Sequence, residues 1–264
     1  MRRLRLILEY DGTRYCGFQR QPGQLTVQGE LERRLSRICG HPIQVAGAGR
    51  TDTGVHALGQ VIHFDTTGRI PVERVALATN SYGGDLVVRH VEEAPPDFHA
   101  RFSAIERTYH YFLSLEQPSP FAARYSVFVP SMRPDAEKRM REALEPLVGK
   151  RDFSTVSAAG SSGSVERNLR RTSVCRRGTM FRVELTADSF LRSMVRMLAG
   201  WLLEIGRGAR EPLELADAVF RRDPPGAVKI AAARGLFLMR VRYPDGFCDG
   251  MGADGIANWW PGCV

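Results

Sequence analysis

The order of the periodic segments in the first part of the chain limits the folds that it can adopt. Hydrophobic residues alternate with other residues from Leu4 to Tyr10, which predicts a half-buried strand. Hydrophobic residues then recur every three or four positions after Thr26, which can cap a helix that ends at Gly40. The next segments predict strands at 43–48 and 60–65, a helix at 71–79 and a strand at 86–91. Strand, helix, strand, strand, helix, strand is the order of a ferredoxin-like split βαβ unit.

The second half of the chain repeats this theme less regularly. Strand patterns occur at 107–115, 169–176, 180–186 and 235–243, the middle pair forming a hairpin that turns at Arg177 and Gly178, and helices are expected at 135–148 and 189–206. We therefore expect an α+β fold of two related ferredoxin-like α/β halves, with mainly antiparallel sheets that form a central cleft. The expected organisation is a domain at 1–104, a domain at 105–243 and a tail at 244–264 that holds Trp259 and Trp260, with a flexible inserted loop at 158–164.

The composition is that of a globular protein with a basic surface. Lys and Arg total 37 against 29 Asp and Glu, a formal net charge of +8, which favours a polyanionic partner such as nucleic acid. Nearly all of the excess is arginine, whose planar guanidinium suits phosphates and stacked bases, although a GC-rich genome gives the same bias. The five cysteines form no C-x-x-C pair, which indicates reduced thiols in a cytoplasmic protein. No apolar run is long enough to span a membrane.

One loop, from Gly47 to Ala57, concentrates groups that can do chemistry. It holds Arg50, Asp52 and His56 between glycines, which permit unusual backbone angles. No zinc-type spacing is present, so no metal site is expected, and the loop lacks the G-K-[ST] ending of a phosphate-binding Walker loop. The alternative is a purely structural turn in which the aspartate side chain accepts hydrogen bonds from nearby backbone amides.

Two other segments carry candidate partners for this loop. On the helix expected from Ser189, Arg192 and Arg196 project together away from the apolar face, where they would be solvated unless that side faced a cleft containing a carboxylate. Tyr109 and Tyr111 share one face of a strand, where they either pack in the core or stack on an unpaired base.

Short motifs run in order through the chain as far as Tyr243. They are Tyr10-Asp11-Gly12-Thr13, Gly17-Phe18-Gln19-Arg20-Gln21, Thr26-Val27-Gln28-Gly29, Leu31-Glu32, Gly49-Arg50-Thr51-Asp52-Thr53-Gly54-Val55-His56-Ala57, Phe98-His99-Ala100-Arg101-Phe102-Ser103-Ala104, Arg107-Thr108-Tyr109, Phe190-Leu191-Arg192-Ser193-Met194-Val195-Arg196 and Gly235-Leu236-Phe237-Leu238. In this order they resemble the tRNA pseudouridine synthase A family. The sequence departs from the family pattern at Arg151, at Gly83-Gly84 and at Ala231-Ala232-Ala233.

The resemblance implies an isomerase that converts uridine to pseudouridine at positions 38 to 40 of the tRNA anticodon stem-loop, as a homodimer and without a cofactor. It also implies a role for each matching residue. Asp52 corresponds to the nucleophile, Tyr109 to a base-stacking tyrosine, Arg50 and Arg196 to active-site arginines, and Leu236 to an apolar residue of the pocket.

The chemistry agrees with these roles. Pseudouridine formation needs neither a redox partner nor an external group donor, and an aspartate carboxylate, ionised at neutral pH, can add covalently to an electrophilic carbon. The sequence leaves open whether Asp52 attacks C1′ or C6 or assists loss of a glycal, and which group accepts the C5 proton. Two other functions remain possible at this stage: a non-catalytic RNA-binding protein with two ferredoxin-like domains, and a metal-dependent phosphate-handling enzyme.

Overall fold

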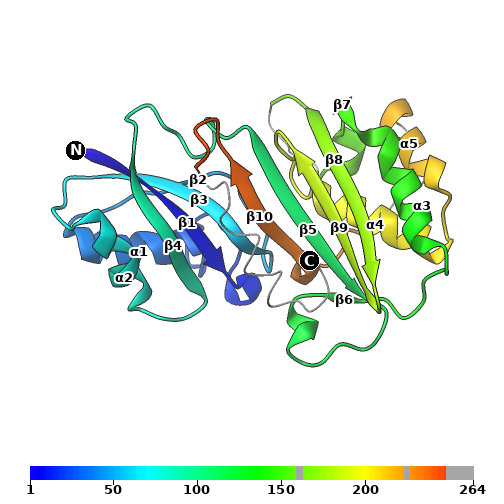
Figure 1. Cartoon of the computed structure of the whole chain (residues 1–264), viewed down its shortest axis with the longest axis horizontal. Coiled ribbons are helices and arrows are strands. Elements are labelled where there is room, and N and C mark those ends of the chain that lie inside the picture. The colour runs from blue at the N-terminus through cyan, green and yellow to red at the C-terminus, as the bar shows by residue number, and fades with distance from the viewer. Residues whose placement is uncertain (159–162, 223–225, 227, 248–264) are drawn as a thin grey trace. The chain divides into compact units, whose positions relative to one another are not determined.

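A computed structural model describes residues 1–158, 163–222, 226 and 228–247 of the chain (Figure 1). These residues divide into two compact units, which we call unit 1 and unit 2. Unit 1 contains 1–105 together with the described residues from 237 onward, and unit 2 contains 106–236. Most of the expected inserted loop and of the expected tail, including Trp259 and Trp260, lies outside the described residues.

The sheet of unit 1 has a mainly antiparallel core. Strands β1 (Arg2–Tyr10), β3 (His56–Thr66) and β4 (Leu86–Ala94) take the order β4-β1-β3, with both pairs antiparallel. The two-residue strand β2 (Ala46–Gly47) pairs antiparallel with β3, and β10 (Leu236–Arg242) pairs with it in parallel through Phe237 and Leu238. The sequence placed the β10 segment with the second half, because alternation identifies a strand but not its partner.

Two helices of unit 1 lie on one face of this sheet (Figure 1). Helix α1 (Val27–Cys39) begins where Thr26 Oγ1 accepts a hydrogen bond from the Gly29 amide at 3.2 Å, and it ends at Gly40, whose φ is 75°. Helix α2 (Val72–Asn80) follows β3. The strand predicted at the start of the chain is confirmed, but it is not half-buried: Leu4, Leu6 and Leu8 on one face are fully buried, and Arg5 and Ile7 on the other face are buried as well.

The sheet of unit 2 has the order β5-β9-β8-β7 and is antiparallel throughout this path. Its strands are β5 (Glu106–Ser114), β7 (Gly149–Asp152), β8 (Glu166–Arg177) and β9 (Met180–Ala187), and β6 (Val127–Phe128) pairs in parallel with β5. The predicted hairpin is confirmed: β8 and β9 join through a turn in which Gly178 has a φ of 57°.

Three helices complete unit 2: α3 (Ala136–Leu144), α4 (Met194–Arg207) and α5 (Pro212–Arg221), with α3 packed against the other two and against β8. The predicted start of α4 at Ser189 is wrong. Ser193 adopts a left-handed conformation with φ of 56°, so the helix begins only at Met194. Arg192 therefore precedes the helix, and the expected pairing of Arg192 with Arg196 on one helical face is not present. Helix α5 was not expected, although Pro212 and the bond from the Glu211 amide to Glu214 at 2.7 Å mark its start.

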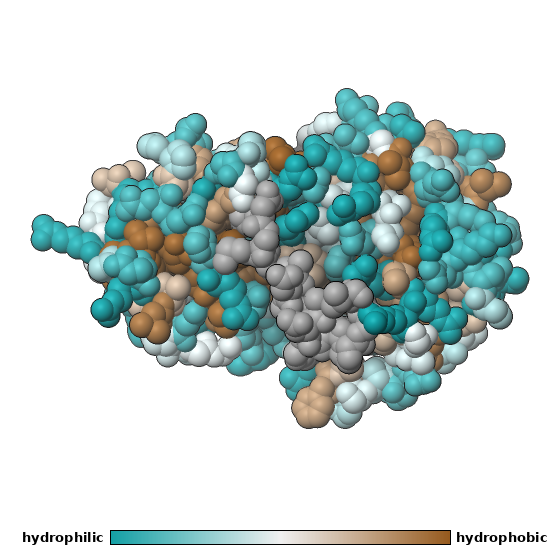
Figure 2. Space-filling model, viewed as in Figure 1, coloured by the Kyte–Doolittle hydropathy of each residue, from teal (hydrophilic) through white to brown (hydrophobic). Residues whose placement is uncertain are grey.

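Short 3₁₀ turns η1 to η5 connect these elements at Gly12–Arg14, Ala122–Arg124, Glu145–Leu147, Ser154–Val156 and Ala233–Gly235. The protein is thus a mixed α/β structure with mostly antiparallel strands, as expected, whereas the relation of both halves to the ferredoxin-like fold stays a prediction. Hydrophilic residues cover much of the surface seen in Figure 2. Among the described residues, no helix has the length and apolar character needed to cross a bilayer.

Candidate functional site

The loop that carries Asp52 joins β2 to β3 in unit 1. Arg50 is exposed and Asp52 is half-buried. Backbone hydrogen bonds hold the loop on both sides of the aspartate: the Phe18 amide donates to the Thr51 carbonyl at 3.0 Å, and the Val55 amide donates to the Asp52 carbonyl at 3.1 Å. The aspartate therefore stands on a backbone that is fixed by hydrogen bonds before any substrate binds.

A buried network of polar side chains on β1 and β3 also supports this loop. The Tyr10 hydroxyl lies 2.9 Å from Thr51 Oγ1, and Gln60 Nε2 donates to the Gly49 carbonyl at 2.8 Å and to the Tyr10 hydroxyl at 3.4 Å. Burial raises the pKa of Tyr10 to about 12, so the phenol stays protonated at neutral pH. Tyr10 lies on β1 and Gln60 lies on β3, and these two strands are paired. The network therefore fixes the loop relative to the sheet.

The segment from Gly12 to Gly17 packs directly against the loop. A Cβ added at Gly12 would lie 2.0 Å from the Val55 carbonyl oxygen, and one added at Gly17 would lie 2.7 Å from the Thr51 carbonyl oxygen. Gly17 also has a φ of 83°, a conformation that favours glycine. These two glycines explain why the motif near residue 12 and the motif near residue 50 occur together in one chain.

His56 is a structural residue of the core. Its ring is 1% exposed and stacks on the Phe237 ring at a centroid distance of 4.6 Å. Its Nδ1 lies 3.1 Å from both the Gly12 amide nitrogen and Asp11 Oδ1. His56 thus connects the end of the Asp52 loop to η1 and to β10.

In unit 2, Tyr109 lies on β5 and is 8% exposed. Its ring meets the Phe190 ring edge-to-face at a centroid distance of 5.1 Å, which fixes the plane of the tyrosine. A stacking surface for a base needs a fixed plane of this kind.

Arg196 lies in the first turn of α4 and is tied to the segment that precedes η5. Its Nε donates to the Ala231 carbonyl at 2.9 Å, and the Ala231 amide donates to the Arg196 carbonyl at 3.1 Å. These two bonds fix both the backbone of Arg196 and the plane of its guanidinium group.

Leu236 is presented by the same segment, which packs on β5. The Tyr111 hydroxyl donates to the Ala232 carbonyl at 2.8 Å, and a Cβ at Gly235 would lie 2.9 Å from the Phe112 carbonyl oxygen. Leu236 follows directly and is 5% exposed. Unit 2 therefore connects Arg196, Leu236 and the strand of Tyr109 through the segment 231–236.

The predicted site residues thus form two groups: Arg50 and Asp52 in unit 1, and Tyr109, Arg196 and Leu236 in unit 2. The sequence analysis missed the supporting residues Gln60 and Tyr10. A signal for Gln60 was present, because an amide side chain in the middle of an apolar strand must find a buried partner.

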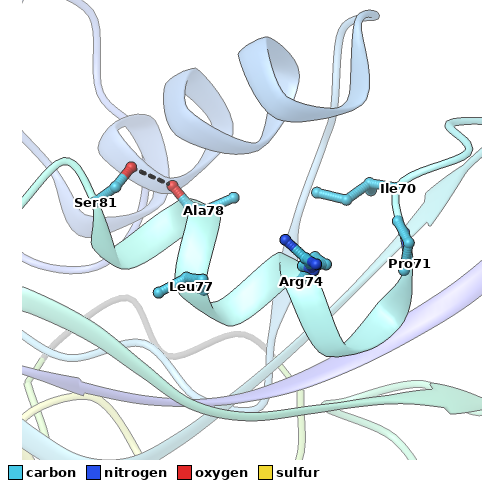
Figure 3. Close-up of a pocket in the computed structure, with 6 residues that line it drawn as sticks. All are labelled: Ile70, Pro71, Arg74, Leu77, Ala78 and Ser81. Carbon is cyan, nitrogen blue, oxygen red and sulfur yellow. Dashed lines mark hydrogen bonds between the residues drawn. The ribbon is translucent and has the colours of Figure 1, made fainter.

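Two features of the described residues bear on metal and ligand binding. Within the described ranges, no three His, Cys, Asp or Glu side chains gather closely enough to hold a metal ion. A surface hollow runs along α2, outside both groups of predicted residues (Figure 3). It is lined by Ile70, Pro71, Arg74, Leu77, Ala78 and Ser81.

Comparison with known proteins identifies the family. The family model described as tRNA pseudouridine synthase matches residues 6–103 and 143–244. A tRNA pseudouridine synthase A of Chlorobium luteolum is 44% identical over 94% of this chain and 98% of its own length. The enzyme of the same name from Brevibacillus brevis is 42% identical over 92% of this chain and 100% of its own length.

The chain belongs to the tRNA pseudouridine synthase family. The predicted family is therefore confirmed, and so is the predicted enzyme class, an isomerase acting on tRNA. Among solved structures, a chain of an archaeal box H/ACA sRNP Nop10-Cbf5 complex matches 76% of this chain and 44% of its own length, with 12% identity and a TM-score of 0.33. That likeness is too distant to support an argument about the site.

Proposed function

We propose that this synthase isomerises uridine at positions 38 to 40 of the tRNA anticodon stem-loop, with Asp52 as its nucleophile. The observation that carries the proposal is the loop itself. Asp52 is half-buried and lies two residues after the exposed Arg50, and its backbone is held by hydrogen bonds from the Phe18 amide to the Thr51 carbonyl and from the Val55 amide to the Asp52 carbonyl. A nucleophile accelerates a reaction most when its position is fixed before the substrate binds.

The reaction rearranges atoms within one nucleotide. The N1–C1′ bond breaks, the base turns, and a C5–C1′ bond forms, while the C5 proton is lost to solvent and N1 gains a proton. The carboxylate of Asp52 supplies an electron pair to an electrophilic carbon of the nucleotide and recovers it when the new glycosidic bond is complete. The protein supplies position and charge, and every carbon, nitrogen and oxygen atom of the product comes from the substrate.

The other site residues have roles that fit their surroundings. The target uridine must leave its stack to be reached, and the exposed Arg50 side chain can occupy the space that it leaves. Tyr109, held by Phe190, stacks on the flipped uracil, and Leu236 provides an apolar wall. Arg196, whose Nε donates to the Ala231 carbonyl, supplies positive charge to the bound nucleotide.

The same proposal covers the architecture and the assembly. Both halves, unit 1 and unit 2, are related ferredoxin-like domains, and each group of site residues contributes to the reaction. The protein works in the cytoplasm as a homodimer without a cofactor. Light scattering at the concentration used for assay should give about twice the chain mass of 29.5 kDa, and a monomer there would overturn the dimer.

Mapping of the modified nucleotide tests the substrate assignment. A tRNA transcript with uridines at positions 38 to 40 is incubated with the enzyme, and pseudouridine is located by chemical modification and primer extension. Transcripts in which those uridines are replaced by cytidine serve as controls. Pseudouridine at 38 to 40 alone is expected, whereas pseudouridine that persists elsewhere in the control transcripts would refute the assigned positions while leaving the isomerase activity intact.

A further inference from the structure

An aromatic side chain of unit 1 stands exposed where the fold does not require it. Phe102 lies in the turn after β4 and is 76% exposed, although large apolar side chains are usually covered. Its ring lies 4.4 Å from the His99 ring, at an angle of 35°. The guanidinium carbon of Arg101 lies 5.5 Å from the centre of the same ring. The Phe102 ring thus has a histidine ring and a positive charge as close neighbours.

The turn that carries Phe102 is fixed by its own hydrogen bonds. His99 Nδ1 accepts from the amides of Arg101 and Phe102 at 3.1 and 3.3 Å. The Ser103 amide donates to the His99 carbonyl at 2.9 Å, and the His99 amide donates to Ser103 Oγ at 2.9 Å. Burial, together with the charges of Arg3 and Arg101, lowers the pKa of His99, so Nδ1 remains an acceptor at neutral pH.

Ala100, at the start of the turn, is bonded to the core of unit 1. The Ala100 amide donates to His63 Nδ1 at 3.1 Å, and the Tyr243 hydroxyl donates to the Ala100 carbonyl at 2.6 Å. The Phe98 side chain is buried beside Tyr243, with ring centroids 5.1 Å apart. The exposed ring therefore has a rigid mount, so little conformational entropy is lost when it binds a ligand.

We propose that Phe102, together with Arg101, is a stacking platform for an unpaired base of the RNA substrate. A fixed aromatic ring beside a guanidinium group suits a nucleobase, because the ring stacks on the base while the arginine is attracted to the phosphate backbone. The net charge of +8 favours the same polyanionic ligand. The inference rests on the proposed function in that the RNA is taken to be the tRNA substrate.

The platform reaches a nucleotide other than the one that reacts. The turn is attached at His63, whereas the Asp52 carbonyl is bonded to the Val55 amide beside His56, which is seven residues away from His63 along β3. At about 3.3 Å per residue this places the two ends of the strand segment roughly 23 Å apart. The platform therefore contributes to the affinity for RNA, whereas the chemical step proceeds at Asp52.

The test combines substitution with a fluorescent base. Stem-loop RNAs that each carry 2-aminopurine at one unpaired position are titrated with the wild-type protein and with Phe102→Ala, Phe102→Tyr and Phe121→Ala. Phe121 is the control because it is 79% exposed and belongs to unit 2. Loss of a stacked aromatic ring should weaken binding about 5- to 150-fold for Phe102→Ala. Phe102→Tyr keeps a ring and should bind as the wild type does, and Phe121→Ala should too.

Two further readouts separate this inference from the function. At one or more positions the wild type should quench 2-aminopurine, and Phe102→Ala should abolish that quenching and raise KM without lowering kcat. Equal affinity and equal quenching for Phe102→Ala would overturn the platform even if pseudouridine is formed. Conversely, a wild type that forms no pseudouridine but shows Phe102-dependent quenching would refute the proposed function alone. A changed light-scattering mass for Phe102→Ala would assign Phe102 to contacts between copies of the chain and also overturn the platform.

Discussion

The Asp52 loop and the segment 231–236 are both held by hydrogen bonds, but the partners of the loop lie within one stretch of the sequence, whereas those of the segment come from two separate stretches. The hydrogen bonds around Asp52 come from residues between Tyr10 and Gln60, which are up to 50 residues apart in the chain. The segment 231–236 is fixed by Arg196, 35 residues away, and by Tyr111, which is 121 residues from its partner Ala232. A contiguous motif can be recognised from sequence, whereas the contacts that join separate segments into a site can be recognised only from the three-dimensional structure.

Removing the carboxylate from the loop should have the largest effect. Asp52→Asn preserves the size of the side chain but lacks the nucleophile, and loss of a nucleophile costs at least about 10⁴-fold in turnover. Pseudouridine is quantified in digested tRNA, and tRNA affinity is measured by filter binding. Asp97→Asn, at an exposed aspartate of the same unit, is the control. Near-normal turnover by Asp52→Asn would remove Asp52 from the mechanism.

A substitution in the segment that packs against the loop should test how firmly this packing holds the loop. Gly17→Ala combines a φ of 83° with a Cβ only 2.7 Å from the Thr51 carbonyl, and it should lower the free energy of unfolding by about 3 kcal/mol. Gly23→Ala has a similar φ of 70° but open space around its Cβ, so it should lose only about 1 kcal/mol. Urea titration gives both values. Equal losses would mean that the packing against Thr51 contributes nothing.

On the unit 2 side, the ring of Tyr109 should matter more than its hydroxyl. Tyr109→Ala removes the stacking surface and should lower kcat/KM by about 5- to 150-fold. Tyr109→Phe keeps the ring and its edge-to-face contact with Phe190, so steady-state kinetics should show a smaller loss. If Tyr109→Phe instead loses as much as Tyr109→Ala, the hydroxyl has a direct part in the chemistry.

The smallest predicted effect is a dependence of stability on pH in unit 1. Burial, with the charges of His99 and Arg3, lowers the pKa of His63 from 6.5 to about 4. Because the folded pKa is below the unfolded one, this histidine stabilises the fold fully above pH 6.5, and the contribution is lost as pH falls toward 4. Urea titrations at pH 7 and pH 4.5 should show a decrease to which His63 contributes about 1 to 2 kcal/mol. The same decrease in His63→Gln would show that another group is responsible.

Much of this fold was predictable because the decisive signals are local. The cap at Thr26 and the end at Gly40 fixed α1 to the residue, and alternation located β1 and the β8–β9 hairpin. Signals that depend on distant partners failed. The pairing of β10 with β3 involves only two residue pairs, and no sequence pattern could have revealed it.

The candidate site shows the same division. Asp52 and Arg50 were predicted from one motif, whereas the two bonds between Arg196 and Ala231 join segments that have no visible relation in sequence. The late start of α4 came from the left-handed Ser193, a conformation that serine rarely adopts and that helix propensity cannot predict.

The central claim, that this chain isomerises uridine in tRNA by itself, is tested most directly by tritium release. Wild-type protein is incubated with tRNA carrying tritium at uridine C5, in the presence of EDTA, and the tritium that appears in water is counted. The proposed reaction predicts release that matches, mole for mole, the pseudouridine found in the digested tRNA. Tight tRNA binding without any release of tritium, with or without added Mg²⁺, would contradict it.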